Sequence, residues 1–181
     1  MKSVAKIYLL TGESQTGKTI LCLEVVEIAK QKGIRLGGLV SPGVFHEGQK
    51  TAIDLLDVQS GKRLRLAESI EAGETEISTQ RWAFKTDAVN RGNQILKDAV
   101  PCDLLVIDEL GPLEFQRGEG WVSGFKTITS SAYKAALLVI RPSLIDKALK
   151  RWDVDKVINL DEPGQLGQSA EKIIQSLFPN S

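Results

Sequence analysis

The chain has 181 residues, of which 42% are hydrophobic, and its 23 basic and 23 acidic residues give a formal net charge of zero. This length and apolar content fit one packed domain, so we expect residues 1–181 to form a single domain. The balanced charge argues against an extended nucleic-acid-binding surface, and no apolar run is long enough to span a membrane.

The few cysteines and the single histidine limit the chemistry that the chain can carry. Cys22 and Cys102 are the only cysteines and do not form a C-x-x-C pair, so we expect reduced core thiols. His46 is the only histidine, which excludes histidine-rich metal sites. The N-terminus carries no apolar signal region. These features predict a cytoplasmic protein.

The first predicted strand leads directly into a phosphate-binding motif. Residues 4–10 form a β-prone apolar run, and apolar residues at helical spacing follow the motif until Gly33. Between them the pattern G-x-x-x-x-G-K-[ST] is matched by Gly12, Glu13, Ser14, Gln15, Thr16, Gly17, Lys18 and Thr19. A strand, a loop and a helix in this order place a triphosphate on the amides of the helix N-terminus.

Each part of the motif has its own expected role. Gly12 and Gly17 allow tight turns that direct backbone N–H groups inward. Lys18 supplies a positive charge to the β- and γ-phosphates, and the Thr19 hydroxyl can ligate Mg²⁺. We therefore predict that residues 12–19 bind a nucleoside triphosphate.

The next segment predicts an antiparallel addition to the sheet. Residues 36–44 form a second predicted strand that contains glycines. Two further runs, 51–58 and 62–67, flank a turn at 59–61 and predict a hairpin. Residues 68–79 carry four glutamates and no basic residue, which indicates either a lid or an exposed loop.

A second candidate for the site ends a buried strand. After a predicted helix over 88–99, capped by Asp87, the run 104–107 is apolar and ends in Asp108 and Glu109. The C-terminal ends of parallel strands face the ligand in this class of fold. We predict that Asp108 holds Mg²⁺ opposite Thr19 and that Glu109 accepts a proton from the attacking water.

The remaining elements continue the alternation of strands and helices that indicates an α/β fold. A loop over 117–120 precedes a helix over 121–132, and a strand over 135–140 precedes a helix over 143–151. A strand over 154–160 and a helix over 165–178 close the chain. Arg141 directly follows the 135–140 strand, where it is either a catalytic cation or an ordinary salt-bridged surface residue. Weaker candidates for the same role are Lys85, Arg91 and Arg117.

Together, the phosphate loop, the hairpin and the segment from Asp108 to Glu114 resemble the small P-loop nucleoside-triphosphatase family of thermophiles and vertebrates. The second signature of that family, close to D-E-[IL]-G-x-x-E, is matched at Asp108, Glu109, Gly111 and Glu114. The resemblance places these residues at the nucleotide, where Glu114 either binds water or braces the loop; an exposed carboxylate is the alternative.

The resemblance also implies a fold and an activity. The fold would be a three-layer P-loop sandwich whose mostly parallel sheet follows a RecA- or AAA-like order, here with the added hairpin. The activity would be Mg²⁺-dependent hydrolysis of ATP, GTP and other nucleoside triphosphates. Two positions depart from the family, Gln15 in place of a glycine and Ile20 in place of a threonine. The C-terminal region, including residues 161–164, fits the family poorly, so no base pocket is carried over.

Two other functions remain open at this point. A nucleoside or small-molecule kinase shares the phosphate loop but needs an acceptor pocket, and the acidic 68–79 segment argues against a basic lid. A nucleotide-dependent switch or assembly protein would act through a partner, for which the sequence offers no candidate.

Overall fold

The computed structural model describes residues 5–70, 77–78, 82–162 and 169–179. Its strands are β1 (Lys6–Thr11), β2 (Leu36–Val40), β3 (Gly43–His46), β4 (Gln49–Asp57), β5 (Arg63–Ser69), β6 (Ile77–Ser78), β7 (Trp82–Phe84), β8 (Leu104–Leu110), β9 (Ala135–Ile140) and β10 (Lys156–Asn159). Its helices are α1 (Lys18–Gln31), α2 (Thr86–Asp98), α3 (Val122–Thr129), α4 (Ile145–Arg151) and α5 (Ala170–Leu177), with a π-helical turn η2 (Leu113–Arg117) and a 3-10 turn η3 (Pro142–Leu144).

All ten strands belong to one sheet, in the order β10-β1-β9-β8-β2-β4-β5-β7-β6, with β3 paired to β4. Neighbours from β10 to β2 pair in parallel, whereas β4 and every strand beyond it pair antiparallel. If the five parallel strands are numbered along the chain, their order is 5-1-4-3-2. This arrangement confirms the predicted fold, a mostly parallel sheet extended by antiparallel strands.

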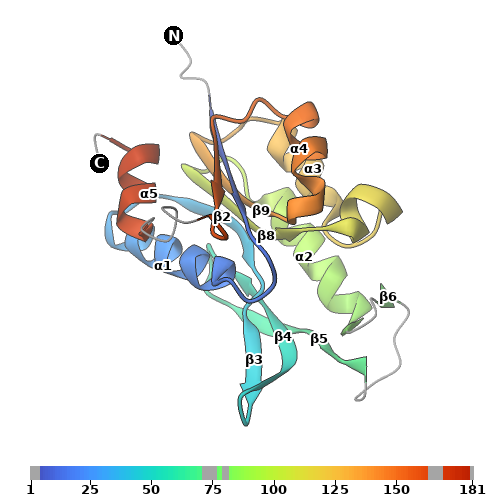
Figure 1. Ribbon diagram of the computed structural model, residues 1–181. Coiled ribbons are helices and arrows are strands. Elements are labelled where there is room, and N and C mark those ends of the chain that lie inside the picture. Colours follow the sequence, from blue (N-terminus) through green and yellow to red (C-terminus); the bar gives the residue numbers. More distant parts are fainter. Residues whose placement is uncertain (1–4, 71–76, 79–81, 163–168, 180–181) are drawn as a thin grey trace.

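Helices cover both faces of the parallel strands, because successive side chains of a buried strand point to opposite faces. Leu9 and Leu138 pack with the core that includes residues of α2, while Leu10 and Val139 pack with residues of α1 and α5. In Figure 1, α1 and α5 lie on one side of the sheet and α2, α3 and α4 on the other. All six residues of β9 are buried, as expected for a strand covered on both faces.

The glycines of the second strand are explained by a close approach of the backbone. A Cβ atom on Gly37 would lie 2.0 Å from the Ala99 carbonyl oxygen just after α2, so no other residue allows this packing. The predicted single strand over 36–44 is wrong in detail, because Ser41 and Pro42 separate β2 from β3. Proline lacks the N–H that a continuing strand would need.

The antiparallel hairpin is confirmed in β4 and β5. The Asp57 side chain closes its turn by accepting hydrogen bonds from the backbone N–H groups of Gln59 (3.0 Å) and Ser60 (3.4 Å). Of the acidic segment predicted over 68–79, Glu68 and Ser69 instead complete β5, and residues 77–78 form β6. Residues 71–76 and 79 lie outside the described part of the chain.

Several predicted helix and strand boundaries change. Helix α2 begins at Thr86 after Lys85, and no side chain caps it, so the predicted Asp87 cap is wrong; Asp87 lies in the first turn. The turn η2 occupies residues just before the predicted loop over 117–120 and includes its first residue, Arg117. The turn η3 precedes α4. In α5 the Ser169 hydroxyl accepts a hydrogen bond from the Lys172 N–H (3.3 Å), while the start predicted at residue 165 falls outside the described residues.

Within the described residues no helix is long and apolar enough to cross a membrane.

Candidate active site

The phosphate loop lies between β1 and α1, as the motif predicts. Gly12 and Gly17 have φ angles of 148° and 88°, in the region that favours glycine. Gln15 also has a positive φ, 68°, which explains why a glycine at this position suits the loop better than a residue with a Cβ atom. Helix α1 has no side-chain cap and no acidic residue in its first turn, so its N-terminal amides are available to an anion.

Lys18 lies inside the loop. Its side-chain ammonium donates to the carbonyl oxygens of Gly12 (2.7 Å) and Glu13 (2.5 Å), and the residue is only 8% exposed. These contacts hold the ammonium at the centre of the loop. It is therefore placed to attract phosphate oxygens.

A residue from another strand end supports the loop. The Asp161 side chain, two residues after β10, accepts a hydrogen bond from the Glu13 backbone N–H at 2.8 Å. This contact fixes the first half of the loop from the side of β1 that pairs with β10, whereas β9 pairs with the other side. No motif in the sequence predicts this contact, although Asp161 follows a parallel strand at the same C-terminal edge as the predicted site residues.

Asp108 lies at the C-terminal end of β8 and is 2% exposed. Burial, followed by the charge of Glu109, raises the pKa of its carboxyl to about 6, while a hydrogen bond with the Thr19 side chain lowers that pKa. The Ser41 backbone N–H also donates to Asp108 Oδ2, at 3.3 Å. The predicted pair of Thr19 and Asp108 thus lines one cavity, from the start of α1 and from β8.

The Thr19 and Asp108 pair suits a hard divalent cation. A buried carboxylate whose ionised form is disfavoured gains stability from an added positive charge. A carboxylate and a hydroxyl are also oxygen ligands of the kind that Mg²⁺ uses, with water completing its shell. The described residues contain no cluster of three or more carboxylate, cysteine or histidine ligands that would hold a metal on protein groups alone.

Glu109, the next residue, points toward Arg141. The Arg141 Nε donates to Glu109 Oε1 at 2.6 Å, and the two side chains are 55% and 29% exposed. Arg141 directly follows β9, which lies between β1 and β8 in the sheet. The salt bridge agrees with the second interpretation of Arg141, and its role as a catalytic cation stays a prediction.

Glu114 is buried and braces the loop after β8. Its two carboxylate oxygens accept hydrogen bonds from the backbone N–H groups of Gly111 (2.7 Å) and Trp121 (2.8 Å). Burial raises the pKa of this carboxyl to about 7 despite those donors. Gly120 leaves room for it, since a Cβ there would lie 2.1 Å from Glu114 Oε1. The alternative of an exposed carboxylate is wrong.

These groups line one cavity of about 690 Å³. Its wall includes Gly12, Glu13, Ser14, Lys18 and Thr19 of the loop, together with Asp108, Glu109, Gly111, Glu114 and Arg141. Of the weaker cation candidates, Arg117 lies in this wall, and the structure adds Ser41 and Lys50 to it. Ser41 follows β2 and was recognisable by its place at a strand end, whereas nothing in the sequence indicated Lys50, which lies on the antiparallel β4.

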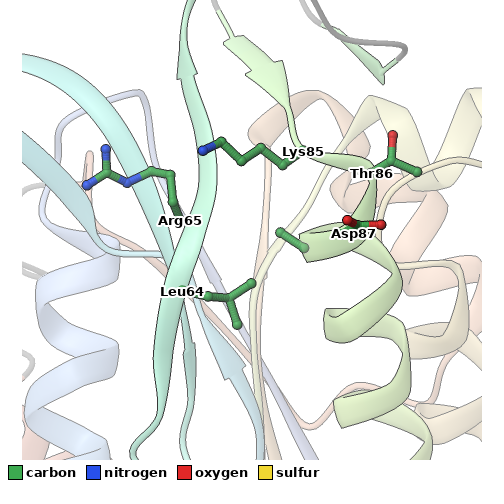
Figure 2. Close-up of a pocket in the computed structure, with 6 residues that line it drawn as sticks. Leu64, Arg65, Lys85, Thr86 and Asp87 are labelled. Carbon is green, nitrogen blue, oxygen red and sulfur yellow. The ribbon is translucent and has the colours of Figure 1, made fainter.

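A second hollow, of about 470 Å³, opens where α2 begins, beside β5 (Figure 2). Leu64 points toward the start of the helix, and Lys85 extends toward the strand. Its cations already have partners, because Lys85 is 3.4 Å from a Glu68 oxygen and Arg65 is 2.7 Å from an Asp54 oxygen. Neither Lys85 nor the exposed Arg91 on α2 lines the cavity that holds the phosphate loop.

Comparisons with known proteins agree with this geometry. The model of a family described as NTPase matches residues 7–119. The chain is 26% identical over 152 residues to "Nucleoside-triphosphatase THEP1" of Methanopyrus kandleri, covering 81% of this chain and 82% of the relative. It is 27% identical over 167 residues to the protein of the same name from Methanosarcina barkeri, covering 90% and 94%.

A solved structure shares the fold. The solution structure of a human cancer-related nucleoside triphosphatase superposes with a TM-score of 0.69 at 19% identity, covering 98% of this chain and 100% of that chain. At this identity the likeness establishes the fold alone, and it supports the three-layer arrangement seen in Figure 1.

Proposed function

This chain belongs to the NTPase family and is a nucleoside-triphosphatase, and we propose that residues 12–19 bind the triphosphate while Asp108 and Glu109 serve its hydrolysis. The observation that carries this proposal is that Thr19, at the start of α1, and Asp108, near the end of β8, line the same cavity. It brings together the two motifs that are separated by about ninety residues in the sequence.

Binding would rest on the loop and Lys18. The free amides at the start of α1 face the phosphates, and the Lys18 ammonium exchanges its contacts with loop carbonyls for contacts with the β- and γ-oxygens. This exchange keeps the ammonium hydrogen-bonded before and after binding, so no buried charge is left without a partner.

Thr19 and Asp108 would hold Mg²⁺. When bound, the ion neutralises charge on the β- and γ-phosphate oxygens as the bond between them breaks. Ser41 would keep the Asp108 carboxylate oriented, through its backbone N–H and through the hydrogen bond that its hydroxyl donates to the Asp108 carbonyl oxygen at 2.7 Å.

Glu109 would orient the attacking water and accept its proton. In the structure this carboxylate is held by Arg141, whose guanidinium is also close enough to the cavity to line it. We infer that Arg141 positions Glu109 and adds positive charge near the transferring phosphoryl group. Glu114 is assigned a positioning role, because its hydrogen bonds fix the backbone of Gly111 and Trp121 rather than reaching the ligand.

The test is phosphate release from ATP, GTP, CTP and UTP with and without Mg²⁺. Lys18→Ala should abolish release and weaken triphosphate binding by roughly 1.5–3 kcal/mol, the value of a charge-assisted hydrogen bond. Lys97→Ala, an exposed position on α2, is the matched control. A folded Lys18→Ala protein that hydrolyses at the wild-type rate would remove the loop from the active site.

A further inference from the structure

The cavity continues well beyond the groups needed for hydrolysis. Past Asp108 and Glu109, its wall is formed by six apolar or aromatic residues, Ile53, Leu66, Trp82, Phe84, Val89 and Trp121. We name this part the aromatic chamber. It lies between the antiparallel strands β4, β5 and β7 on one side and α2 with the segment before α3 on the other.

The order of the strands places the chamber on the γ-phosphate side of the site. From the phosphate loop after β1, the sheet passes Arg141 after β9, then Asp108 and Glu109 on β8, and only then β2, β4, β5 and β7. The carboxylates therefore separate the loop from the chamber. Because Lys18 and Thr19 hold the terminal phosphates and their cation, the end of the triphosphate that faces the carboxylates also faces the chamber.

Hydrolysis alone does not account for such a space. An attacking water has a liquid volume of about 30 Å³ and needs polar partners. The phosphate loop and the chamber share one cavity of about 690 Å³, which is within the range of sites that hold small organic ligands. Three aromatic rings and three aliphatic side chains favour a flat apolar ring over water or a second phosphate.

A cation lies where the chamber joins the carboxylates. The Lys50 ammonium is 5.2 Å from the centre of the Trp82 ring, and Lys50 lines the same cavity as Asp108 and Glu109. Lys50 thus contributes positive charge to both parts of the cavity. A polar substituent on a ring in the chamber would be directed toward Lys50 and Glu109.

We propose that this protein also transfers the γ-phosphoryl group to a second substrate, a small planar aromatic or heteroaromatic alcohol bound in the aromatic chamber with its hydroxyl group at Glu109. This proposal rests on the proposed function, because it uses the same phosphate loop and the same base. The acceptor oxygen forms a bond to the γ-phosphorus, and the bond from that phosphorus to the β,γ-bridging oxygen breaks. The hydroxyl proton passes to Glu109, and the products are a phosphomonoester and a nucleoside diphosphate.

Glu68, the first glutamate of the acidic 68–79 segment, is paired with cations. The Glu68 carboxylate lies 3.4 Å from the Lys85 ammonium and 3.8 Å from the Arg65 guanidinium. The negative charge of Glu68 is therefore balanced by two cations. Lys50, on the neighbouring strand β4, contributes a positive charge to the cavity wall.

The first experiment measures where the γ-phosphoryl group goes. Purified protein is incubated with Mg²⁺-ATP and one alcohol at a time, and nucleoside diphosphate, inorganic phosphate and phosphomonoester are quantified by ³¹P NMR. The panel contains a nucleoside (cytidine), a one-ring heteroaromatic alcohol (a hydroxymethylpyridine) and glycerol, which has hydroxyl groups but no ring. We expect phosphomonoester from at least one aromatic alcohol and none from glycerol, and the two aromatic members distinguish a nucleoside from a one-ring acceptor.

The second experiment assigns the transfer to the chamber. Trp82→Ala and Phe84→Ala should each lower the fraction of phosphoryl groups delivered to the alcohol by about tenfold, the value of roughly one stacking contact. Phe45→Ala removes an aromatic ring that is 62% exposed on β3 and outside the cavity, and should leave that fraction unchanged. The fraction is measured within each variant, so it does not depend on the overall rate.

The outcomes separate this proposal from the hydrolase itself. Diphosphate and inorganic phosphate formed in equal amounts with both aromatic alcohols would overturn the transfer while leaving the proposed hydrolysis intact. Equal phosphorylation of glycerol, or a Trp82→Ala change confined to the KM for ATP, would also overturn it, the latter by placing the nucleobase in the chamber. No diphosphate under any condition would instead refute the proposed function.

Discussion

The Arg141 guanidinium donates a 2.6 Å hydrogen bond to the Glu109 carboxylate, although 32 residues separate them in the chain. The two residues end neighbouring parallel strands, β9 and β8, so the pairing follows from the order of strands in the sheet. This contact holds the candidate base in one orientation before any ligand arrives.

Replacing Glu109 by glutamine separates catalysis from binding. Glu109→Gln keeps the size of the side chain and its hydrogen bonding to Arg141 but removes the base, so single-turnover hydrolysis should slow by about 10²–10⁴-fold. Triphosphate affinity, measured by direct titration, should persist. Glu24→Gln, on the exposed side of α1, is the control. Wild-type turnover in Glu109→Gln would show that another group activates the water.

Arg141 can be tested by comparing two substitutions. Arg141→Ala should lower kcat by roughly 10²–10³-fold, the cost of removing one fixed electrostatic donor from a reacting centre. Arg141→Lys retains the charge but not the planar group that contacts Glu109, so its rate should fall between those of the alanine variant and the wild type. If both variants lose only affinity for the triphosphate, Arg141 binds substrate in the ground state and does not act on the chemical step.

Asp108→Asn should raise the free energy of unfolding of the metal-free protein and weaken its use of Mg²⁺. Because the pKa of Asp108 is raised to about 6, its ionised form destabilises the metal-free protein above that pH, and an amide removes this cost. Unfolding at pH 8 without Mg²⁺ should require up to about 3 kcal/mol more free energy in the variant. The Mg²⁺ concentration for half-maximal activity should rise roughly 10- to 100-fold, as expected for loss of one charged ligand. An unchanged Mg²⁺ requirement would exclude Asp108 from the metal site.

Glu114 makes the pH dependence of stability testable. Burial raises the pKa of its carboxyl from 4.5 to about 7, so between these values the folded protein holds a proton that the unfolded chain releases. The stability linked to this group is therefore complete below pH 4.5 and is lost as the pH rises through about 7. Measured by urea unfolding from pH 4.5 to 8, the wild type should lose on the order of 3 kcal/mol relative to Glu114→Gln. Parallel curves for the two proteins would show that Glu114 does not titrate in this range.

The local parts of the site could be predicted from the sequence because each is encoded by consecutive residues. Eight residues over 12–19 define the phosphate loop, and an apolar run followed by Asp108 and Glu109 defines a strand end that faces the ligand. The positive φ of Gln15, 68°, is a conformation that glycine adopts more readily than a residue with a Cβ atom. The exact ends of helices could not be predicted in this way, because propensity does not fix the residue at which a helix begins. Helix α2, for example, begins at Thr86 and not at the predicted residue 88.

The contacts of Glu114 show where local pattern fails. Within the sequence, this residue stands between Leu113 and Phe115 with nothing that indicates its contacts, and only the folded chain brings the N–H groups of Gly111 and Trp121 to its two oxygens. The same is true of the contact from Asp161 to the loop, which spans 148 residues.

By itself, then, the sequence determined the groups on which the proposed chemistry of this protein rests: a loop for phosphates, a hydroxyl and a carboxylate proposed for a cation, and a second carboxylate proposed for a proton. The tertiary structure alone decided which residues surround that chemistry, including the Arg141 partner of Glu109 and the aromatic chamber beyond it. The physical reason is that phosphate binding depends on the conformation of adjacent residues, whereas a cavity wall is assembled from strands and helices whose neighbours are set by the packing of the whole sheet.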